Sequence, residues 1–421
     1  MAAHRRDGLD PDAALGRYRD AHQPAVDPRL PAPARRQPPG DGAGAHPLPD
    51  HAEARHRRHR ILRSQIERTD TFVNTLRVGL IGAGGISQVH ASGWAALGVP
   101  VTVYSHEGAE ALAAEYGFDI ATGLDSLLAA SDLVDIVTSS NSHKELALSA
   151  IAAGKHVICE KPLSVTAADA RELADAAADA GVRLFPAHVV RFFPEYVAVK
   201  AQVDAGRIGD PAVLRFVRGG QAPRAGSWFF DENAGGGIIL DQMIHDLDQA
   251  RWLAGEVTQV YAVQSPESVD GIVPGIVTAH VTLTHASGAI SHVQGTWGPD
   301  GTVFRTSADV AGSRGTLSID SRKDTATVLD FPAGVSGDGY LPPSTTAVSP
   351  YTRQLAAFLE AVVDGTDAVV TPEDGVRAVA IAEAAAASLR TGRAVDIDQG
   401  TGLAVADPSV AGSHIAENVG A

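Results

Sequence analysis

Residues 76–87 read LRVGLIGAGGIS, and this stretch decides the fold. Its first six residues form a short apolar run that is typical of a buried strand, and Gly82 and Gly84 follow at once. A helical stretch then continues to Gly98. A strand, a glycine-rich turn and a helix in this order predict the first unit of a dinucleotide-binding fold.

The glycines of this turn suit a pyrophosphate. Gly82 permits the tight turn and Gly84 lets the backbone approach the anion, while the new helix directs unpaired N–H groups at it. We therefore expect the cofactor to contact Gly82, Gly84, Gly85 and Ile86. The third fingerprint position holds Ser87, which is a mild departure, and the alternative is a glycine-rich turn that binds nothing.

The end of the second predicted strand is where NAD and NADP sites differ. NAD sites usually place Asp or Glu there, about 20 residues after the glycines, to hold the ribose hydroxyls. Here the strand ends at Ser105, which could accept a 2'-phosphate, yet Glu107 would repel one and no Lys or Arg occurs from 78 to 143. The sequence therefore predicts NAD or NADP and leaves the choice open.

Apolar runs and Ala-rich helical stretches keep alternating beyond this turn, which predicts parallel strands with crossover helices in a doubly wound sheet. After about residue 210 the segments become longer and β-type, with a hairpin expected at Gly288, one helix near 238–253 and helical stretches at 352–365 and 373–392. The fold class is α/β. The expected parts are a disordered extension at 1–74, for which a translation start near Val73 is an alternative explanation, a Rossmann domain at 75–195, a second α/β domain at 196–398 and a tail at 399–421.

The composition excludes several classes of protein. The chain of 421 residues is 44% hydrophobic and 20% charged, and no window is apolar enough for a membrane helix. A single cysteine, Cys159, excludes an internal disulfide and a thiolate zinc site, so we expect the cytoplasm and no metal. Residues 1–70 hold 13 Arg and 10 acidic residues, so the rest of the chain, with 21 basic and 40 acidic residues, carries a charge of -19. We therefore expect neither nucleic acid nor a membrane as partner.

Polar residues follow two further predicted strands. The tripeptide EKP at 160–162 ends the strand HVICE, and NSH at 141–143 follows the strand before it. Ligands bind where parallel strands end, so Lys161 could hold a substrate hydroxyl, with Pro162 fixing the direction of the chain. The alternative is a plain surface turn, which is common for a Lys-Pro pair after a strand.

A third group of polar residues lies in the helical stretch that follows the glycines at 235–237. Asp241, His245 and Asp248 are spaced four and three residues apart, which places them on one face of a helix. A His with a carboxylate one turn away suits general base catalysis, and the alternative is the solvated edge of the helix. The neighbouring apolar stripe, expected to face the core, consists of Leu240, Ile244 and Leu247.

Together these residues resemble the Gfo/Idh/MocA oxidoreductases, the family of glucose-fructose oxidoreductase and inositol dehydrogenase. The resemblance runs from Leu76 to about Asp398 and rests on GLIGAGGIS, HVICEKP, VVRFFPEY, GRIGDP and GGGIILDQMIHDLDQARWLAG. EKP followed by a D-x-x-x-H helix is its specific part. It implies an N-terminal Rossmann domain and a C-terminal α/β domain with a large, mostly antiparallel sheet, often used for oligomerisation, and hence a homodimer or homotetramer.

The resemblance also assigns roles to matching positions. The implied catalytic group is Lys161, Asp241 and His245, with a cis peptide between Lys161 and Pro162. The implied cofactor contacts beyond the glycine turn are Ser105, Asn141, His143 and Glu160. The implied substrate contacts are His188, Arg191 and Trp228. The chain departs from the family at Ser140, where Pro is common, and at Ser105, where an acid is usual.

The sequence thus predicts an NAD(P)-dependent oxidoreductase that transfers hydride between the nicotinamide and a secondary alcohol or ketone of a sugar, cyclitol or related polyol. His245 would remove the hydroxyl proton, Asp241 would orient its imidazole and Lys161 would hold the alcohol oxygen. Two alternatives remain. One is a cofactor-sensing regulator that has kept the fold and lost the reaction, and the other is a reductase of a non-sugar carbonyl or an imine.

Overall fold

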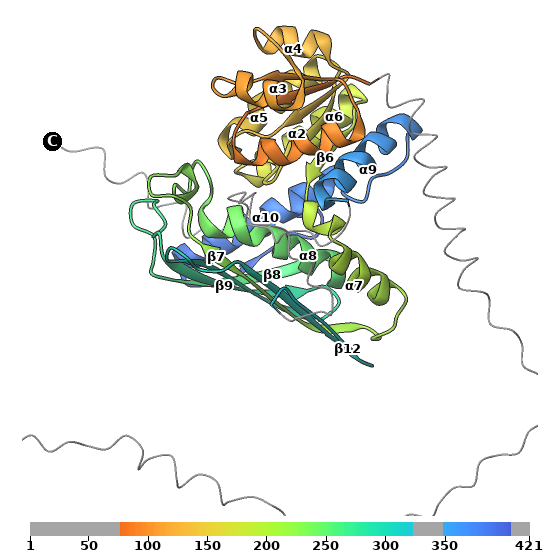
Figure 1. Cartoon of the computed structure of the whole chain (residues 1–421). Helices are drawn as coiled ribbons and strands as arrows, with labels where there is room; N and C mark the ends of the chain where they lie inside the picture. The colour runs from red at the N-terminus through yellow and green to blue at the C-terminus, as the bar shows by residue number, and fades with distance from the viewer. Residues whose placement is uncertain (1–75, 323–347, 406–421) are drawn as a thin grey trace, which may run out of the picture. The chain divides into compact units, whose positions relative to one another are not determined.

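The computed structural model describes residues 76–322 and 348–405, and two sheets organise this part of the chain (Figure 1). The predicted extension at 1–74 lies outside the described residues, as do residues 406–421 of the predicted tail. Residues 399–405 are described and return to the second sheet, since the Val405 N–H donates to the Asp396 carbonyl at 2.8 Å.

The first sheet has six parallel strands in the order β3-β2-β1-β4-β5-β6. Its strands are β1 Val78–Ile81, β2 Val101–Tyr104, β3 Asp119–Ile120, β4 Leu133–Ile136, β5 His156–Glu160 and β6 Leu184–Ala187. The strand order reverses between β1 and β4, and ligands of such sheets bind in the crevice outside the carboxyl ends at that point. The predicted doubly wound sheet is confirmed.

Five α-helices of the described chain connect these strands: α2 Gly85–Leu97, α3 Ala109–Tyr116, α4 Leu124–Ala130, α5 His143–Ala152 and α6 Ala167–Ala180. As the sequence predicted, α2 ends at Gly98, whose φ of +69° is left-handed and suits glycine. Neither β3 nor α4 was predicted from the sequence, because two and seven residues are too few to show a period.

The second sheet has seven strands in the order β12-β11-β7-β10-β9-β8-β13. They are β7 Pro211–Gln221, β8 Val257–Ser265, β9 Val277–His285, β10 Ile290–Gly298, β11 Arg305–Gly312, β12 Thr316–Asp320 and β13 Val395–Asp396. Only β7 and β10 pair in parallel, so the expectation of a mostly antiparallel sheet is confirmed. The predicted hairpin joins β9 to β10, with Gly288 at φ +86° in its turn.

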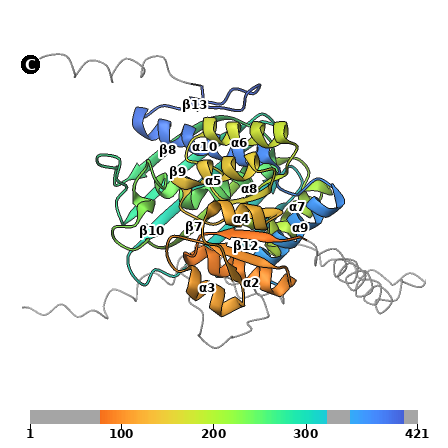
Figure 2. The ribbon, with the colours of Figure 1, turned by 90° about the horizontal axis from the view of Figure 1, so that it is seen from above.

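Helices cover one face of the second sheet. α8 Ile244–Ala254 packs on β7, and α10 Pro372–Thr391 packs on β8 and beside α6 (Figure 2). Residues 238–250 are all buried. The alternative that this helix forms a solvated edge is therefore wrong, whereas its apolar residues lie in the core as predicted.

Helix α9, Pro350–Asp364, packs on the first sheet's helices although it follows the second sheet in sequence. Its Phe358 ring stacks on Phe185 of β6 at 4.8 Å between ring centroids. A methyl group on Gly93 of α2 would lie 2.8 Å from Leu355 Cδ1, so glycine allows the two helices to approach closely. The segment that the sequence assigned to the second domain thus completes the core of the Rossmann part.

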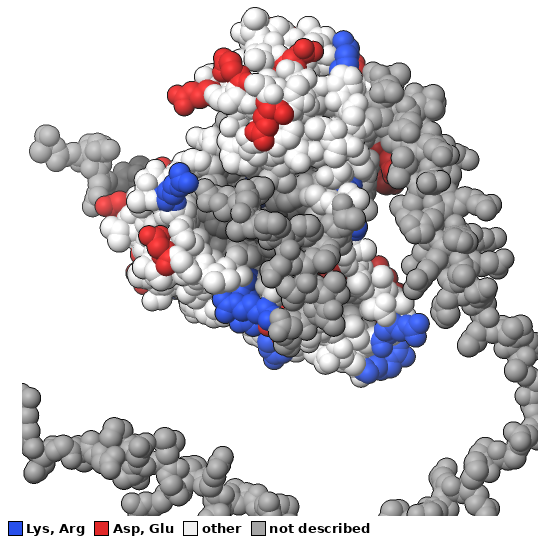
Figure 3. All heavy atoms as spheres, viewed as in Figure 1, with Lys and Arg blue, Asp and Glu red and all other residues white. Residues whose placement is uncertain are grey.

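Charge is distributed unevenly on the face in Figure 3. Asp and Glu side chains gather over the helices of the first sheet, whereas Lys and Arg lie toward the second sheet. In the parts that the structure describes, 76–322 and 348–405, no helix is long and apolar enough to cross a membrane.

Candidate active site

The glycine turn leaves its outer side open. Gly82 has φ +115°, and a methyl group there would lie 2.8 Å from the Val137 carbonyl oxygen, so this position requires glycine. Gly84 and Gly85 are exposed, and among the described residues, chain neighbours aside, a methyl group on either would meet no atom within 4 Å. α2 begins here without a side-chain cap, and Ile86 lies half-buried in its first turn. The outer side of the turn therefore has room for a pyrophosphate at a helix N-terminus, where backbone N–H groups lack intrahelical partners.

The end of β2 lies beside the glycine turn. The Gly82 N–H donates to the Tyr104 carbonyl at 2.9 Å, and the next residue, Ser105, is half-buried. Glu107, two residues further on, is exposed. The position expected to contact the cofactor ribose is thus next to the turn, and the charge that follows it is negative.

Asn141 and His143 lie after β4 in different surroundings. Asn141 is exposed, and its Oδ1 accepts a 2.8 Å hydrogen bond from Ser139. The His143 ring is buried, with Nδ1 2.7 Å from the Pro162 carbonyl oxygen and Nε2 3.2 Å from that of Thr138. Burial lowers the pKa of His143, and the two carbonyl oxygens, which accept from the ring, act in the opposite direction. This geometry lets His143 support the EKP loop through the Pro162 carbonyl, and its expected contact with the cofactor stays a prediction.

Glu160 ends β5 inside a buried network that no local sequence pattern predicted. One carboxylate oxygen lies 3.1 Å from His90 Nε2, and the other accepts the Lys161 N–H at 3.0 Å. His90 Nδ1 in turn lies 2.9 Å from Asp135 Oδ2, which also accepts the Trp94 indole N–H at 2.7 Å. An Asp inside the apolar run LVDIV was the available signal, since a buried carboxylate needs a partner.

Lys161 and Asp241 meet, although 80 residues separate them in sequence. Lys161 Nζ donates to Asp241 Oδ1 at 2.9 Å and to the Asp241 backbone carbonyl at 2.8 Å. The Asp241 side chain is 2% exposed and that of Lys161 14%. The peptide before Pro162 is cis, as the family resemblance implied. An amine from the end of β5 is therefore fixed against the helix that carries the third predicted group.

The expected contact between Asp241 and His245 is absent. Asp241 Oδ2 and His245 Nδ1 are both buried, and neither has a hydrogen-bond partner among the described residues. The reason is local: Asp241 lies in a π-helical turn, Ile239–Met243, which breaks the four-residue stacking of a regular helix. Burial, followed by the charges of Lys161 and Arg218, holds the pKa of His245 well below its usual value of 6.5, so its imidazole is neutral at pH 7.

Arg191, an expected substrate contact, forms a buried ion pair in this structure. Its side chain is 1% exposed, and Nε and Nη2 donate to the Asp248 carboxylate at 2.9 and 2.6 Å. Nη1 donates to the Val369 carbonyl at 3.1 Å, and Nη2 also lies 3.1 Å from Asp374. Since all three nitrogens are engaged, the geometry makes Arg191 a buried tie between α8 and the loop before α10. Asp248 is the partner in that tie and no part of a catalytic stripe.

His188 follows β6 and is buried. Its side chain is 1% exposed, its Nδ1 lies 4.0 Å from Asp248, and neither ring nitrogen has a hydrogen-bond partner among the described residues. His188 also contributes to the lowered pKa of His245, which places the two imidazoles in one electrostatic environment.

Trp228 lies on the turn that precedes the π-helix. It is half-buried and stacks on Phe229 with 3.9 Å between ring centroids. A methyl group on Gly235 would lie 2.8 Å from the Trp228 carbonyl oxygen, and one on Gly236 would lie 2.3 Å from Leu240. The first two glycines of the 235–237 run are thus needed where this turn packs against the helix.

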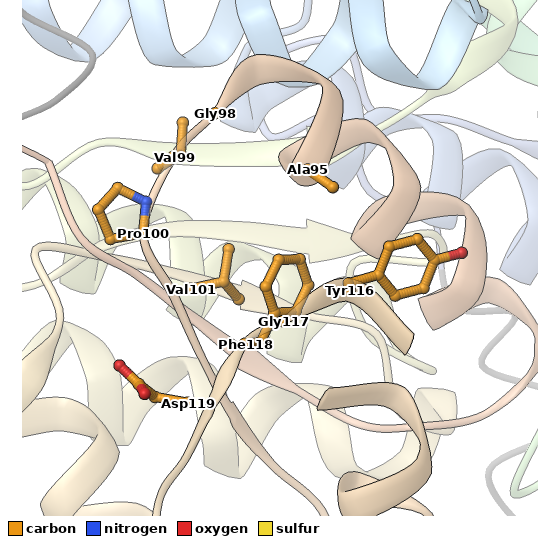
Figure 4. A pocket seen from close by; sticks show the side chains of 9 residues that line it. All are labelled: Ala95, Gly98, Val99, Pro100, Val101, Tyr116, Gly117, Phe118 and Asp119. Atoms are coloured by element: carbon orange, nitrogen blue, oxygen red, sulfur yellow. The ribbon is translucent and has the colours of Figure 1, made fainter. Parts of the chain in front are cut away.

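The hollow in Figure 4 is separate from these residues. It has a volume of about 330 Å³ and is lined by residues at the amino ends of β2 and β3, including Pro100, Tyr116 and Phe118. The glycine turn lies at the opposite, carboxyl end of the sheet, so this hollow is not the dinucleotide site. Within 76–322 and 348–405, no group of three or more His, Cys, Asp or Glu is arranged to hold a metal ion.

The chain is similar to known oxidoreductases over most of its length. Inositol 2-dehydrogenase of Rhizobium meliloti (strain 1021) is 31% identical over 343 residues, which cover 77% of this chain and 99% of that protein. 1,5-anhydro-D-fructose reductase of Ensifer adhaerens is 32% identical over 342 residues, again 77% of this chain and 99% of that protein. A solved structure of levoglucosan dehydrogenase with NADH and levoglucosan matches with a TM-score of 0.66 at 26% identity and covers 77% of this chain and 100% of that one.

Two family models match the chain in succession. Residues 76–188 match the oxidoreductase family with an NAD-binding Rossmann fold, and residues 196–318 match the GFO/IDH/MocA C-terminal domain. Residues 76–188 thus form an NAD-binding domain by family, and the negative charge of Glu107 after Ser105 favours NAD over NADP. The chain belongs to the Gfo/Idh/MocA family of NAD-dependent oxidoreductases.

Proposed function

We propose that the chain transfers hydride between NAD and a secondary alcohol carbon of a sugar or cyclitol, at a site built from Lys161, Asp241 and His245. The observation that carries the proposal is the pair of hydrogen bonds from Lys161 Nζ to Asp241, because they join the end of β5 to the π-helical turn at a largely buried point. Two predicted catalytic residues from distant segments thus share one location.

Lys161 is suited to hold the substrate oxygen. Its ammonium has three N–H donors, and Asp241 accepts two of them. The third donor points to no described acceptor and is free for the alcohol oxygen, on which negative charge develops as hydride leaves carbon. A buried cation of fixed direction stabilises that charge more than solvent would, since it needs no reorientation during the reaction.

His245 is suited to accept the hydroxyl proton. Its lowered pKa keeps the imidazole neutral at pH 7, so a ring nitrogen can take the proton when the alcohol is oxidised and return it in the reverse direction. The imidazolium formed in this way lies near the charged Lys161, which makes it a strong acid and favours rapid return of the proton. Asp241 acts on Lys161 in this scheme, and His245 works without a carboxylate partner.

The glycine turn is suited to hold NAD with its nicotinamide toward Lys161. The N–H groups at the start of α2 would bind the pyrophosphate, and Ser105 and Asn141 follow β2 and β4, the strands on either side of β1. NAD accepts or donates hydride when bound. The chain supplies orientation, the proton acceptor and the charge that stabilises the alkoxide.

The substrate class follows from the relatives and from the polar character of the site. The three relatives named above act, by their names, on inositol, 1,5-anhydro-D-fructose and levoglucosan, all of them polyhydroxylated rings. His188 adds a buried ring that has no hydrogen-bond partner within 76–322 and 348–405, and such a group gains most from a ligand that brings its own donors and acceptors. A polyol ring meets that requirement better than an apolar carbonyl compound.

The test combines cofactor binding with turnover. Thermal-shift titrations with NAD and NADP establish binding, and absorbance at 340 nm then reports turnover on inositols, anhydrosugars and aldoses. Lys161→Ala and His245→Ala should keep NAD binding and lose about 10²–10⁴ in rate. Lys155→Ala and His280→Ala, which change the same residue types elsewhere, should retain the parent rate. Parent-like turnover in Lys161→Ala or His245→Ala would refute the role assigned to that residue.

We also propose a homodimer or homotetramer in the cytoplasm. The face of the second sheet opposite α8 and α10 exposes Tyr261 by 42% and Val263 by 47% along β8, a surface that a second copy could cover. The single cysteine is buried and needs no oxidising compartment. Light scattering on a size-exclusion column would measure the mass, and a monomer at micromolar concentration would contradict the oligomer.

A further inference from the structure

His90 lies between two buried carboxylates that come from different strands. Its Nδ1 is 2.9 Å from Asp135 of β4, and its Nε2 is 3.1 Å from Glu160 of β5. His90 and Asp135 are 0% exposed and Glu160 5%. A ring that reaches a carboxylate with each nitrogen must donate from both, so His90 is an imidazolium and the three side chains carry a net charge of -1.

The surrounding groups sustain this charge state. Burial alone would lower the pKa of His90, but the Asp135 and Glu160 carboxylates outweigh it and raise the pKa to about 10. Burial likewise acts to raise the pKa of Glu160, and His90 is the main group that holds it below the usual range, helped by Lys161 and His143. From α9, the Tyr351 ring meets His90 edge-on at 6.0 Å.

Glu160 connects His90 to the proposed reaction site. The Glu160 oxygen that His90 does not contact accepts the Lys161 backbone N–H at 3.0 Å, and the side chain of the same Lys161 reaches Asp241. The backbone conformation at Lys161, where the chain continues beyond β5, therefore depends on an ionised Glu160. A protonated carboxyl group would be a weaker acceptor for the Lys161 N–H.

We propose that His90 is a positioning residue for Lys161: its imidazolium keeps Glu160 ionised and fixed on the Lys161 N–H, which sets the place of the ammonium at the substrate oxygen. The inference rests on the proposed function of Lys161. His90 touches neither the substrate nor the reacting atoms in this scheme.

Replacing His90 with a neutral residue should therefore act through Glu160. His90→Gln keeps one N–H donor and a similar reach but leaves two buried carboxylates with a charge of -2, so the pKa of Glu160 rises. We expect kcat to fall about 10- to 100-fold, because small misplacements of a catalytic group cost this much. The KM for the polyol and the Kd for NAD should change less than about threefold, and the acidic limb of the kcat profile should move to higher pH.

A second substitution separates charge from packing. In the double variant His90→Gln with Asp135→Asn, the Asn amide can donate to Gln, the Gln amide can donate to Glu160, and the Trp94 indole keeps an acceptor. The net charge returns to -1, so kcat should recover about tenfold and the acidic limb should move back. His280→Gln, an exposed change of the same type, serves as the control, and circular dichroism verifies that each variant folds.

Two results would overturn the inference: His90→Gln with the kcat and pH profile of the parent, or a double variant no better than His90→Gln. If the parent oxidises no polyol at all, the proposed function fails first. Crystal structures of the parent and of His90→Gln then test the role of His90 without an activity assay. The inference requires the Lys161 ammonium to move away from Asp241 in the variant. An unmoved ammonium would overturn it.

Discussion

Replacing Gly84 with Ala should separate cofactor binding from folding. Gly84 has φ -83° and ψ -165°, which any residue adopts, and a methyl group there meets no protein atom within 4 Å. The free energy of unfolding should therefore change by no more than about 0.5–1 kcal/mol. The change should be stabilising, because alanine restricts the backbone of the unfolded chain more than glycine does. The same methyl group would occupy the space into which the pyrophosphate must come to reach the first turn of α2.

The loss of affinity follows from the hydrogen bonds that the methyl group would lengthen. One bond from a backbone N–H to a charged oxygen is worth about 1.5–3 kcal/mol, so the Kd for NAD should rise about 10- to 100-fold. Isothermal titration calorimetry measures the Kd, and urea unfolding measures the stability. Gly123→Ala is the matched control, since Gly123 is also extended, with φ -178°, and equally open. Tight NAD binding by Gly84→Ala would refute the assignment of the pyrophosphate to this turn.

Three further predictions concern charge. Asp248→Asn should lower the free energy of unfolding by about 3–5 kcal/mol in urea titrations, because the buried Arg191 loses its bidentate carboxylate and keeps the single contact with Asp374. A change under 1 kcal/mol would contradict the importance of the Arg191–Asp248 pair. The pKa of His245 in the free chain is held well below 6.5, so kcat/KM should stay flat from about pH 6.5 to 8 and fall only as acid protonates the ring. A limb of kcat/KM near pH 6.5 that disappears in His245→Gln would contradict this. Glu107→Lys should lower the Kd for NADP about tenfold, through removal of a repulsion and gain of an attraction, and an unchanged ratio of NADP to NAD affinity would place Glu107 away from the ribose.

The first sheet could be predicted from the sequence because its signals are local. About ten residues of sequence are enough to predict each of its parts: the run at 76–81, the glycines after it and the alternating helices. Short elements such as β3 and α4 give too little pattern. The side on which α9 packs depends on Gly93 and Phe185, which lie far from it in sequence and carry no sign of their partner.

The sequence predicted which residues form the site better than it predicted which of them contact one another. Lys161 and Asp241 meet as their motifs imply, but the π-helical turn at Asp241 has no sequence signature, so a regular helix wrongly aligned it with His245. The pairing of Arg191 with Asp248 and that of His90 with Asp135 and Glu160 span 45–70 residues. A charged residue inside an apolar run indicates that a partner is needed, but only the fold determines which residue that partner is.

Deuterium transfer tests the central claim most directly. A cyclitol or anhydrosugar that turns over is prepared with deuterium on the reacting carbon and incubated with NAD, and the C4 position of the nicotinamide is read by NMR. The parent should carry the label to C4, whereas Lys161→Ala, with NAD bound at the parent affinity, should carry it at least about a hundredfold more slowly. Label that never reaches C4 in the parent, or reaches it equally fast without the Lys161 amine, would contradict the account.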